Sequence, residues 1–471
     1  MIFTRSFLCD QFTPIALYGR IKELYPTEIT QFFESGVNTI DGNFSYIIVG
    51  ARERLEHRDG TTYYTNDRGI KEEVDPNPLL FLKRYYSQID AEAYQKVAEE
   101  SGVGFVDGFI GYIGYDMVKV FEPILAISMK DLRDPAGIPD FLMVRPRLIL
   151  CYSHKKSRVT LVTSLKEVAS SFDDLEKALQ KPIASMPLKA PVFYDEGRFE
   201  FDRDAFFARI DAAKEMIKSG DVFQILISNR YLRHASVDPL SFYRIIRTKN
   251  PSPYMFLLEF EGFAIAGSSP EVMVRLDREQ VLLRPIAGTR KRGKNRVRDL
   301  ELEEEMLADP KERAEHIMLV DLGRNDVGRI AKTGTVKVEA LMHVERYSHV
   351  MHIVSDVVAE IDESKDMFDL LMATFPAGTM TGAPKIRAMQ LIAEFEGMKR
   401  GFYSGTIGYF GFDGNMDSTI TIRTALIKPD LFIAHAGAGV VADSIPELEE
   451  LEVRNKSAAV ISSLEELATL A

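Results

Sequence analysis

Cysteine is scarce in this sequence, and the shortage excludes two kinds of site. Only two cysteines occur in 471 residues, Cys9 and Cys151, and they form no Cys-x-x-Cys pair. We therefore expect neither a disulfide framework nor a thiolate metal site, as is typical of a reducing compartment. Neither cysteine lies in a Gly-x-Cys-x-Gly turn. A thiol nucleophile of the glutamine-hydrolysing kind is thus not expected in this chain.

Clustered positive charge and long apolar runs are also missing. The 58 Lys and Arg are outnumbered by 70 Asp and Glu, which gives a net charge of −12. Phosphate contacts need clustered Lys and Arg, so we expect no nucleic-acid partner and no binding to an anionic membrane. No stretch reaches the roughly 20 apolar residues of a membrane span, and residues 1–20 contain no long apolar core. The expected location is the cytoplasm.

The remaining composition is that of a globular protein with 46% hydrophobic residues. Pro182, Pro187 and Pro191 mark the main boundary. We predict an N-terminal region, 1–185, interleaved with the core, and a second region, 195–471.

Strand patterns dominate both regions, and helices separate groups of strands in the second. A hairpin is predicted over 147–165, and a helix begins after Asp202 or Asp204. Consecutive hairpins imply antiparallel sheet and an α+β class. Further strands are predicted at 223–232, 255–260, 263–268, 271–276, 280–286, 403–412, 418–427 and 431–436. Further helices are predicted at 298–322, with Asp309 and Pro310 marking a cap and first position inside it, at 365–374 and 383–396, and from Pro446.

Two acidic pairs share one spacing, and each follows a proline that can open a helix. They are Glu312-x-x-Glu315 and Glu449-x-x-Glu452. Residues three apart lie on one helix face, so each pair presents two carboxylates in one direction. Four converging carboxylates repel one another unless a cation lies between them, and oxygen ligands point to Mg²⁺. For either pair alone, a solvated helix face is the favoured interpretation.

Two segments near the C-terminus suit an anion. The alternation in 418–427 places Arg423 on one face with two threonines, where its planar fork can grip a carboxylate. A surface arginine is an equally good interpretation. Gly437, Ala438 and Gly439 end the next strand, and their small side chains let backbone N–H groups approach an anion. A plain tight turn is the more frequent explanation of such a string.

Other titratable residues are candidates for proton transfer or substrate contact. Glu271 follows a strand end and can act as a general acid if burial raises its pKa, although such a glutamate is more often exposed. Of His343, His349 and His352, one is expected to face the substrate and the others to be structural. Lys456 lies one helical turn after the second acidic pair, where an ion pair is the default and substrate contact the alternative.

Seven strings, in order, resemble those of the chorismate-utilising enzymes, and among these the anthranilate synthase component I family. The match is close over 201–456 and scattered before it, as at 108–116. The resemblance implies the fold of that family, which we expect to be two antiparallel sheets packed as a sandwich with flanking helices. The strings are PIAGTR, ERAEHIMLVDLGRND, ERYSHVMHIVSD, FPAGTMTGAPK, GNMDSTITIRT, AGAGVVADS and PELEELEVRNK.

The resemblance also implies a chorismate site that contains Mg²⁺. Glu315 and Glu452 would hold the ion, with Glu312 and Glu449 alongside or through water. Glu271 would protonate the departing C4 hydroxyl, and His352 would assist near the ring. The implied substrate contacts are Lys456, Gly288 and Thr289 for the ring carboxylate, Arg423, Tyr403, Gly437, Ala438 and Gly439 for the enolpyruvyl carboxylate, and Thr379 in the pocket wall.

Two positions separate the activities of this family. Isochorismate and salicylate synthases carry a base lysine where this chain has Gln224, and glutamine cannot deprotonate water. Aminodeoxychorismate synthases carry a lysine where this chain has Ala287. The implied reaction is therefore ammonia addition at C2, loss of the C4 hydroxyl and elimination of pyruvate to give anthranilate, the first step of tryptophan biosynthesis. The alternatives are an aminodeoxychorismate synthase and a noncatalytic, cation-binding regulatory module.

A partner and an effector follow from the same resemblance. Because the chain lacks a thiol nucleophile, a glutamine amidotransferase subunit would supply the ammonia. Tryptophan would inhibit by binding where the family has Leu-Leu-Glu-Ser and Asn-Pro-Ser-Pro-Tyr-Met strings. This chain has Phe-Phe-Glu-Ser at 32–35 and an intact second string at 250–255, so the two phenylalanines put the pocket in doubt. The implied effector residues are Glu34, Ser35, Pro253, Tyr254 and Met255.

Overall fold

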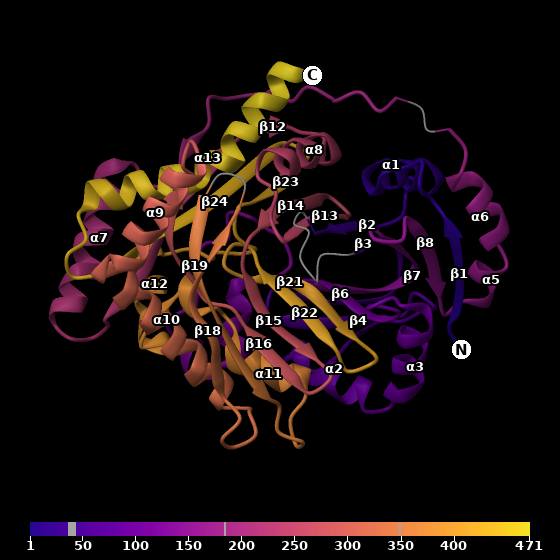
Figure 1. The fold of residues 1–471 in the computed structure, drawn as a ribbon, viewed down its shortest axis with the longest axis horizontal. Helices are drawn as coiled ribbons and strands as arrows, with labels where there is room; N and C mark the ends of the chain where they lie inside the picture. Colours follow the sequence, from indigo (N-terminus) through magenta and orange to yellow (C-terminus); the bar gives the residue numbers. More distant parts are fainter. Residues whose placement is uncertain (36–43, 183–184, 348–349) are drawn as a thin grey trace.

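The chain folds around one large, mostly antiparallel sheet (Figure 1). The computed structural model describes residues 1–35, 44–182, 185–347 and 350–471. The short β9 and β12 pair apart from the large sheet. The strands are β1 Phe3–Leu8, β2 Thr30–Glu34, β3 Phe44–Arg58, β4 Thr61–Thr65, β5 Lys71–Glu73, β6 Gly108–Ile113, β7 Phe141–Ser153, β8 Arg158–Thr163, β9 Val192–Phe193, β10 Arg198–Phe199, β11 Gln224–Arg233, β12 Ala235–Ser236, β13 Tyr254–Phe260, β14 Phe263–Ser269, β15 Val272–Asp277, β16 Gln280–Leu283, β17 Ile286–Lys291, β18 Lys337–Arg346, β19 Val350–Glu360, β20 Gly382–Ala383, β21 Thr406–Gly411, β22 Met416–Ile420, β23 Thr424–Lys428 and β24 Leu431–Val440.

The α+β class is confirmed, but the predicted sandwich of two separate sheets is wrong. The long strand β3 pairs with β2, β4 and β7. In turn β2 pairs with β13, and β6 pairs with β21. Hydrogen bonds therefore run without a break from N-terminal strands into C-terminal ones and merge what would be two sheets into one. The division at 185 and 195 stays a prediction, and both of these strand pairs cross it.

Helices cover the sheet, and several of them begin at a residue whose side chain caps the first turn. Asp202 accepts a hydrogen bond from the Ala205 amide at 2.9 Å and caps α7, as predicted. The predicted helix 298–322 is two helices, because Pro310 keeps Asp309 extended between them. The helices are α1 Pro14–Leu24, α2 Pro78–Tyr86, α3 Ala91–Ser101, α4 Val118–Phe121, α5 Lys166–Ala169, α6 Phe172–Leu179, α7 Arg203–Lys218, α8 Pro239–Lys249, α9 Arg296–Ala308, α10 Pro310–Gly328, α11 Met367–Thr374, α12 Lys385–Glu396 and α13 Pro446–Leu470.

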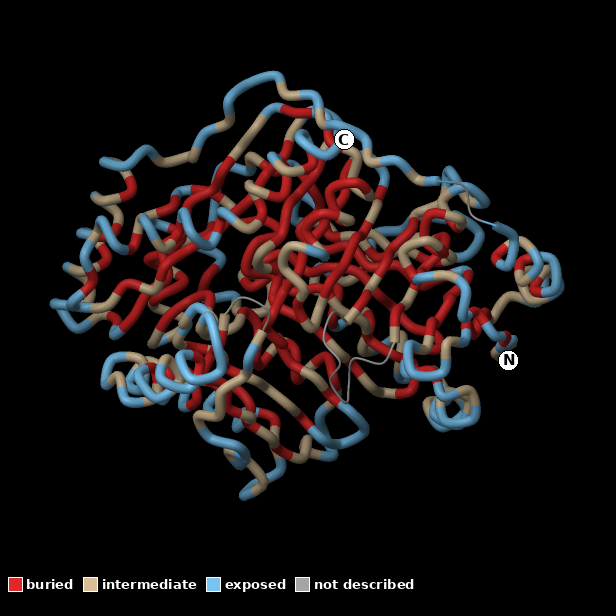
Figure 2. Tube along the Cα trace, turned by 45° about the horizontal axis from the view of Figure 1, so that its top comes forward, coloured by how far each residue is buried: buried red, intermediate tan, exposed pale blue. Residues whose placement is uncertain are grey.

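The core follows the central strands, as the buried segments in Figure 2 show. One large apolar cluster includes Phe109, Ile265 and Phe410, so it draws on both predicted regions. A second cluster lies around α1, α8 and the end of α13 and includes Leu17, Phe242 and Leu464. None of the helices in the described ranges is long and apolar enough to cross a membrane.

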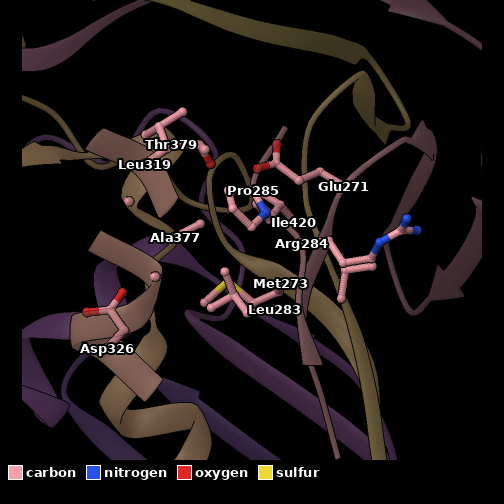
Figure 3. A pocket seen from close by; sticks show the side chains of 13 residues that line it. Glu271, Met273, Leu283, Arg284, Pro285, Leu319, Asp326, Ala377, Thr379 and Ile420 are labelled. Carbon is pink, nitrogen blue, oxygen red and sulfur yellow. The ribbon is translucent and has the colours of Figure 1, made fainter. Parts of the chain in front are cut away.

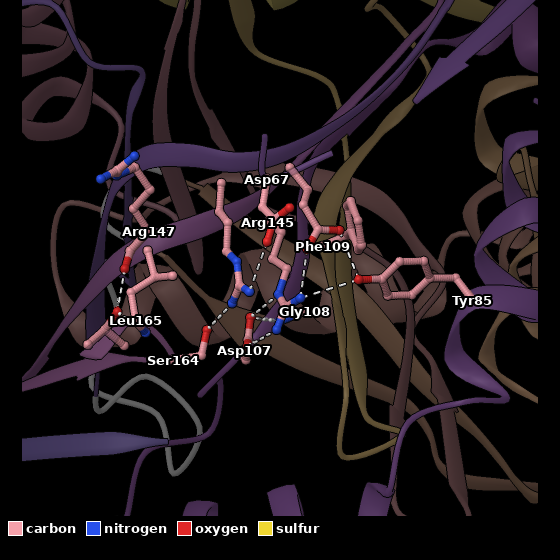
Figure 4. A network of polar contacts seen from close by, with 12 residues as sticks. Asp67, Tyr85, Asp107, Gly108, Phe109, Arg145, Arg147, Ser164 and Leu165 are labelled. Atoms are coloured by element: carbon pink, nitrogen blue, oxygen red, sulfur yellow. Dashed lines mark hydrogen bonds and ion pairs between the residues drawn. The ribbon is translucent and has the colours of Figure 1, made fainter. Parts of the chain in front are cut away.

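A buried ionic network ties the N-terminal strands together (Figure 4). The guanidinium of Arg145 donates to Glu53 at 2.8 Å and to Asp107 at 2.7 Å. It also lies over the Phe412 ring, 4.7 Å from its centroid. These carboxylates raise the pKa of Arg145 and keep it charged. The network joins β3 and β7 to the start of β6 and to the turn after β21, so it supports the interleaved arrangement.

Candidate active site

A small cavity lies between the start of β15, the β16–β17 turn, α10 and residues 377–379 (Figure 3). Glu271 and Thr379 lie at one end of it, and Asp326 lies on α10. Arg284 lines the cavity with its stem, but its guanidinium pairs with Glu345 and Asp356. The end of the cavity at which Glu271 and Thr379 lie is therefore the part that can bind a polar ligand.

Hydrogen bonds fix the backbone of Glu271, and its side chain is buried. Its carbonyl accepts hydrogen bonds from the Thr419 hydroxyl at 2.8 Å and the Ile420 amide at 3.0 Å. The residue is 7% exposed, and burial raises the pKa of its carboxyl to about 7. Nearby Thr379, Lys456 and Arg423 favour the ionised form without offsetting the burial. The carboxyl is consequently half protonated near neutral pH, which is the condition for a general acid.

His352 lies on β19 beside the bulge at Gly288. Its Nδ1 is 2.9 Å from the Gly288 carbonyl and 3.1 Å from the Thr289 hydroxyl. A carbonyl only accepts, so Nδ1 carries the proton and Nε2 has a free lone pair. Burial, with the charge of Arg423, lowers the pKa of this imidazole to about 4. The ring is thus neutral at physiological pH and can accept a proton at Nε2.

Gly288 fits this bulge because of its conformation. Its φ is 64°, a region that residues with a Cβ rarely adopt. A Cβ here would also come within 3.2 Å of the Glu312 carboxylate and of the Ile353 side chain. The backbone at Gly288 therefore packs closely beside Glu312 of the first acidic pair.

Arg423 lies in a break between β22 and β23, so the predicted continuous strand 418–427 is wrong. Its φ is 50°, and its carbonyl accepts from the Ser268 amide at 3.2 Å. Burial lowers the pKa of the guanidinium, while Tyr347 and Glu271 act in the opposite direction. In the described ranges it forms no ion pair. A half-buried guanidinium without a carboxylate suits an anionic ligand.

The small residues 437–439 lie at the end of β24, which continues to Val440 and so extends past the predicted strand end at residue 436. A Cβ on Gly437 would approach the Tyr403 hydroxyl at 3.0 Å, and one on Gly439 would lie 2.6 Å from Gln224 Nε2. Both glycines are therefore needed for close packing. The Ala438 side chain is buried in the apolar cluster under α7 and α12. Lys456 donates to the Gly437 carbonyl at 3.1 Å and thereby joins α13 to this strand.

The two acidic pairs lie on α10 and α13 and affect one another. Burial, Glu312 and Glu452 all raise the pKa of Glu315. Burial and Glu452 raise that of Glu449. The helices thus bring carboxylates of both pairs into electrostatic contact.

Cations already neutralise part of this charge. Arg290 pairs with Glu312 at 2.8 Å, and the default ion pair of Lys456 with Glu452 is present at 2.7 Å. In the part of the chain that the structure describes, no three or more acidic, histidine or cysteine side chains are arranged to hold a metal ion. The oxygen-only donor set suits Mg²⁺, but Lys456 and Arg290 occupy two of the carboxylates.

Four polar atoms around this site are buried with no hydrogen-bond partner among the described residues: Gln224 Oε1, His352 Nε2, Thr379 Oγ1 and Thr421 Oγ1. The Thr379 hydroxyl lies beside Glu271 without forming a well-oriented bond. Buried polar groups are rarely left unsatisfied, so the arrangement fits a polar ligand.

The two segments of the predicted effector pocket, 32–35 and 250–255, lie side by side in the sheet, where Met255 on β13 pairs with Glu34 on β2. Arg247 grips the Glu34 carboxylate at 2.7 and 2.9 Å, and Tyr243 donates to it at 2.8 Å. Tyr254 donates to Asp417 at 2.8 Å. Pro253 and Ser35 are partly exposed at the ends of these strands.

The two phenylalanines that depart from the family pattern differ in their surroundings. Phe32 is buried and stacks on Tyr18, 5.1 Å between ring centroids, whereas Phe33 is only half-buried. Phe32 is therefore part of the core.

Sequence reasoning missed four polar residues behind the site, namely Ser228, Glu396, Arg400 and His435, all of them buried. Of the other candidate histidines, His343 is partly exposed and bonds to the Ala340 carbonyl. His349 lies outside the described residues.

Comparison with known proteins identifies the family of this chain. The model of the chorismate binding enzyme family matches residues 33–462. The chain therefore belongs to that family. Within it, the chain is 39% identical to anthranilate synthase component 1 of Aquifex aeolicus, over 97% of this chain and 93% of the relative. The corresponding protein of Acetivibrio thermocellus is 38% identical over 98% of this chain and 95% of the relative.

Solved structures give the same result. Anthranilate synthase component I from Streptococcus pneumoniae superposes with a TM-score of 0.77 at 32% identity, covering 90% of this chain and 93% of that one. The menaquinone-specific isochorismate synthase of Escherichia coli has a TM-score of 0.72 at 19% identity and covers 98% of this chain and 95% of its own. The second likeness concerns the fold alone.

Proposed function

We propose that this chain is the large subunit of an anthranilate synthase, which converts chorismate and ammonia to anthranilate and pyruvate. The observation that carries the proposal is the buried Glu271 carboxyl, with a pKa near 7, facing Thr379, Arg423 and Lys456. The near full-length similarity to anthranilate synthase component 1 supports it.

The chemistry needs an acid for the leaving hydroxyl and a base for the ring proton. Ammonia forms a bond to C2 while the C4–O bond breaks, and Glu271 gives its proton to the departing hydroxyl, which leaves as water. Loss of the C2 proton with cleavage of the C3–O bond then releases the enolate of pyruvate and leaves an aromatic ring; the added nitrogen loses one proton, and the enolate takes one up at its methylene carbon to give pyruvate. The free Nε2 of His352 is suited to accept a proton near the ring.

Chorismate carries two carboxylates, and this acidic chain offers each a local set of donors. Lys456, Gly288 and Thr289 would receive the ring carboxylate, whereas Arg423, Tyr403 and the backbone of Gly437, Ala438 and Gly439 would receive the enolpyruvyl carboxylate. The unpaired, desolvated guanidinium of Arg423 supports this assignment, because a carboxylate would satisfy it.

Mg²⁺ would bind at the acidic pairs, through Glu315 and Glu452 with Glu312 and Glu449 alongside. When bound, the ion would neutralise the ring carboxylate of the substrate. Mutual repulsion between Glu315, Glu312 and Glu452 is the observation that favours a cation there. Lys456 would have to release Glu452 for this, and the freed ammonium would be available to the substrate.

Ammonia would come from a glutamine amidotransferase subunit. The two cysteines of this chain, Cys9 and Cys151, are buried, and burial raises both thiol pKa values, so neither is an activated nucleophile. At the reacting end, the buried carbonyl oxygen of Gln224 lacks a partner among the described residues and suits an N–H donor such as ammonia. We further propose that the enzyme acts in the cytoplasm and that tryptophan inhibits it at the β2–β13 strand pair.

One experiment separates this activity from its alternatives. Protein, chorismate, Mg²⁺ and an ammonium salt are expected to give the fluorescence of anthranilate. An aminodeoxychorismate synthase would give a C4 amine and no aromatic product without a separate lyase. Isochorismate formed in buffer without ammonia would refute the role assigned to Gln224, and binding of Mg²⁺ without turnover would indicate a regulatory module.

A further inference from the structure

Ser228 lies at the centre of a buried polar chain behind the substrate pocket. It is 1% exposed on β11, and both its amide and its hydroxyl donate to Glu396 Oε1, at 2.9 and 2.7 Å. The same hydroxyl oxygen is 2.9 Å from Nε2 of His435 on β24. Arg400 completes the chain by gripping both oxygens of Glu396, at 2.8 and 2.6 Å.

The direction of each hydrogen bond in this chain follows from its members. The Glu396 carboxylate accepts from Arg400 at both oxygens, so the single hydroxyl proton of Ser228 points to it. His435 must therefore donate its Nε2–H to the Ser228 oxygen. Burial, with the charges of Arg230 and Arg400, holds the pKa of His435 well below its usual range and keeps the ring neutral. One tautomer and one ring orientation result.

The oriented imidazole supports Tyr403. The two rings stack with centroids 4.1 Å apart and planes 24° from parallel. Tyr403 is 2% exposed, and its hydroxyl lies 3.0 Å from the position that a Cβ on Gly437 would take, beside the residue whose carbonyl binds Lys456. A rotation of the His435 ring would remove the surface on which Tyr403 lies and so displace its hydroxyl.

Arg400 also binds two backbone segments that border the pocket. It donates to the carbonyls of Met380 at 2.8 Å and Leu226 at 3.0 Å. Met380 follows Thr379, which lies beside Glu271, and Leu226 lies on the strand that begins with Gln224. The Arg400–Glu396 ion pair therefore connects the segment that contains Thr379 with β11, although neither member of the pair lines the site.

We propose that Ser228, Glu396, Arg400 and His435 form a positioning unit that fixes Tyr403 for a substrate carboxylate. None of the four is assigned a contact with the substrate, so each acts through Tyr403 or the pocket wall. This inference rests on the proposed function, because it takes the ligand of Tyr403 to be a carboxylate of chorismate.

The test is a kinetic series built on Ser228→Ala in the full-length protein, with chorismate and an ammonium salt as substrates. This variant frees the His435 ring, and we expect KM for chorismate to rise about 5-fold, the effect of one lost hydrogen bond, with kcat within twofold. Ser228→Thr keeps the hydroxyl and should restore KM. The matched control is Ser463→Ala, a buried serine on α13 whose hydroxyl donates to the Ala459 carbonyl within the same helix.

A double-mutant cycle distinguishes positioning from general loosening. In a Tyr403→Phe background, Ser228→Ala should change KM by less than twofold, because the hydroxyl that it positions is already absent. An unchanged KM in Ser228→Ala alone, or a full rise in both backgrounds, would overturn the inference. If Ser228→Ala does not fold, His435→Gln retains a donor but no ring, and the same cycle applies.

The series also separates this inference from the proposed function. A wild-type protein that binds chorismate without forming anthranilate contradicts the proposed function. The dissociation constant for chorismate then replaces KM, with the same expected pattern across the variants.

Discussion

Replacing Glu271 with glutamine tests the central electrostatic feature of the site. The buried carboxyl has a pKa of about 7, whereas the ordinary value for a glutamate is 4.5. Between these values the folded protein binds a proton that the unfolded chain has released, so stability falls as pH rises through this window. The shift corresponds to about 3 kcal/mol of unfolding free energy, present below pH 4.5 and lost above pH 7. Glutamine mimics the protonated acid and does not titrate.

The assay is urea denaturation of wild type and Glu271→Gln at several pH values. Other carboxyls titrate in both proteins, so the difference between the two curves isolates Glu271. We expect near-equal stability at pH 4 and a variant more stable by about 3 kcal/mol at pH 8. Parallel curves would refute the reasoning, since they would mean that residue 271 has an ordinary pKa.

Although Glu271→Gln should raise stability, it should lower catalytic activity. Glu271→Gln cannot donate a proton to the C4 hydroxyl, and loss of a general acid typically lowers kcat by about 10²–10⁴-fold. In the wild type, kcat/KM should fall as pH rises through about 7, because the acid form disappears. A stabilised variant with full anthranilate production would show that another group supplies the proton.

Three further predictions concern the metal, the glycine strand and the effector. Glu452→Gln should abolish Mg²⁺-dependent turnover and leave the circular dichroism spectrum unchanged, with the exposed Glu447→Gln as its control; full activity would remove Glu452 from the metal role. Gly439→Ala would bring a Cβ within 2.6 Å of Nε2, the far end of the Gln224 side chain, which would have to move to make room. Because Gln224 is the proposed contact for ammonia, kcat/KM for anthranilate formation should fall about 5-fold, the effect of one lost hydrogen bond. Gly328→Ala meets no atom within 4 Å and should be silent. Saturating tryptophan should inhibit anthranilate formation, and unchanged kinetics would contradict the proposed effector pocket.

The sequence by itself determined the local structure and the family. Asp202 and Asp309 cap helices, and the last helix begins at Pro446, because these signals depend only on neighbouring residues. The order of the motifs indicated the family, which the comparisons confirm. The spacing of each acidic pair placed both of its carboxylates on a helix.

Only the tertiary structure decided how distant segments meet. The union of β2 with β13 and of β6 with β21 made one sheet where two were expected. The break at Arg423 and the Ser228–His435 contact, between residues 207 positions apart, likewise had no local signal. Strand pairing and the burial of polar groups are contacts between residues far apart in the chain. The same residues have no fixed partner, and Glu271 has no raised pKa, until the whole fold removes water from around them.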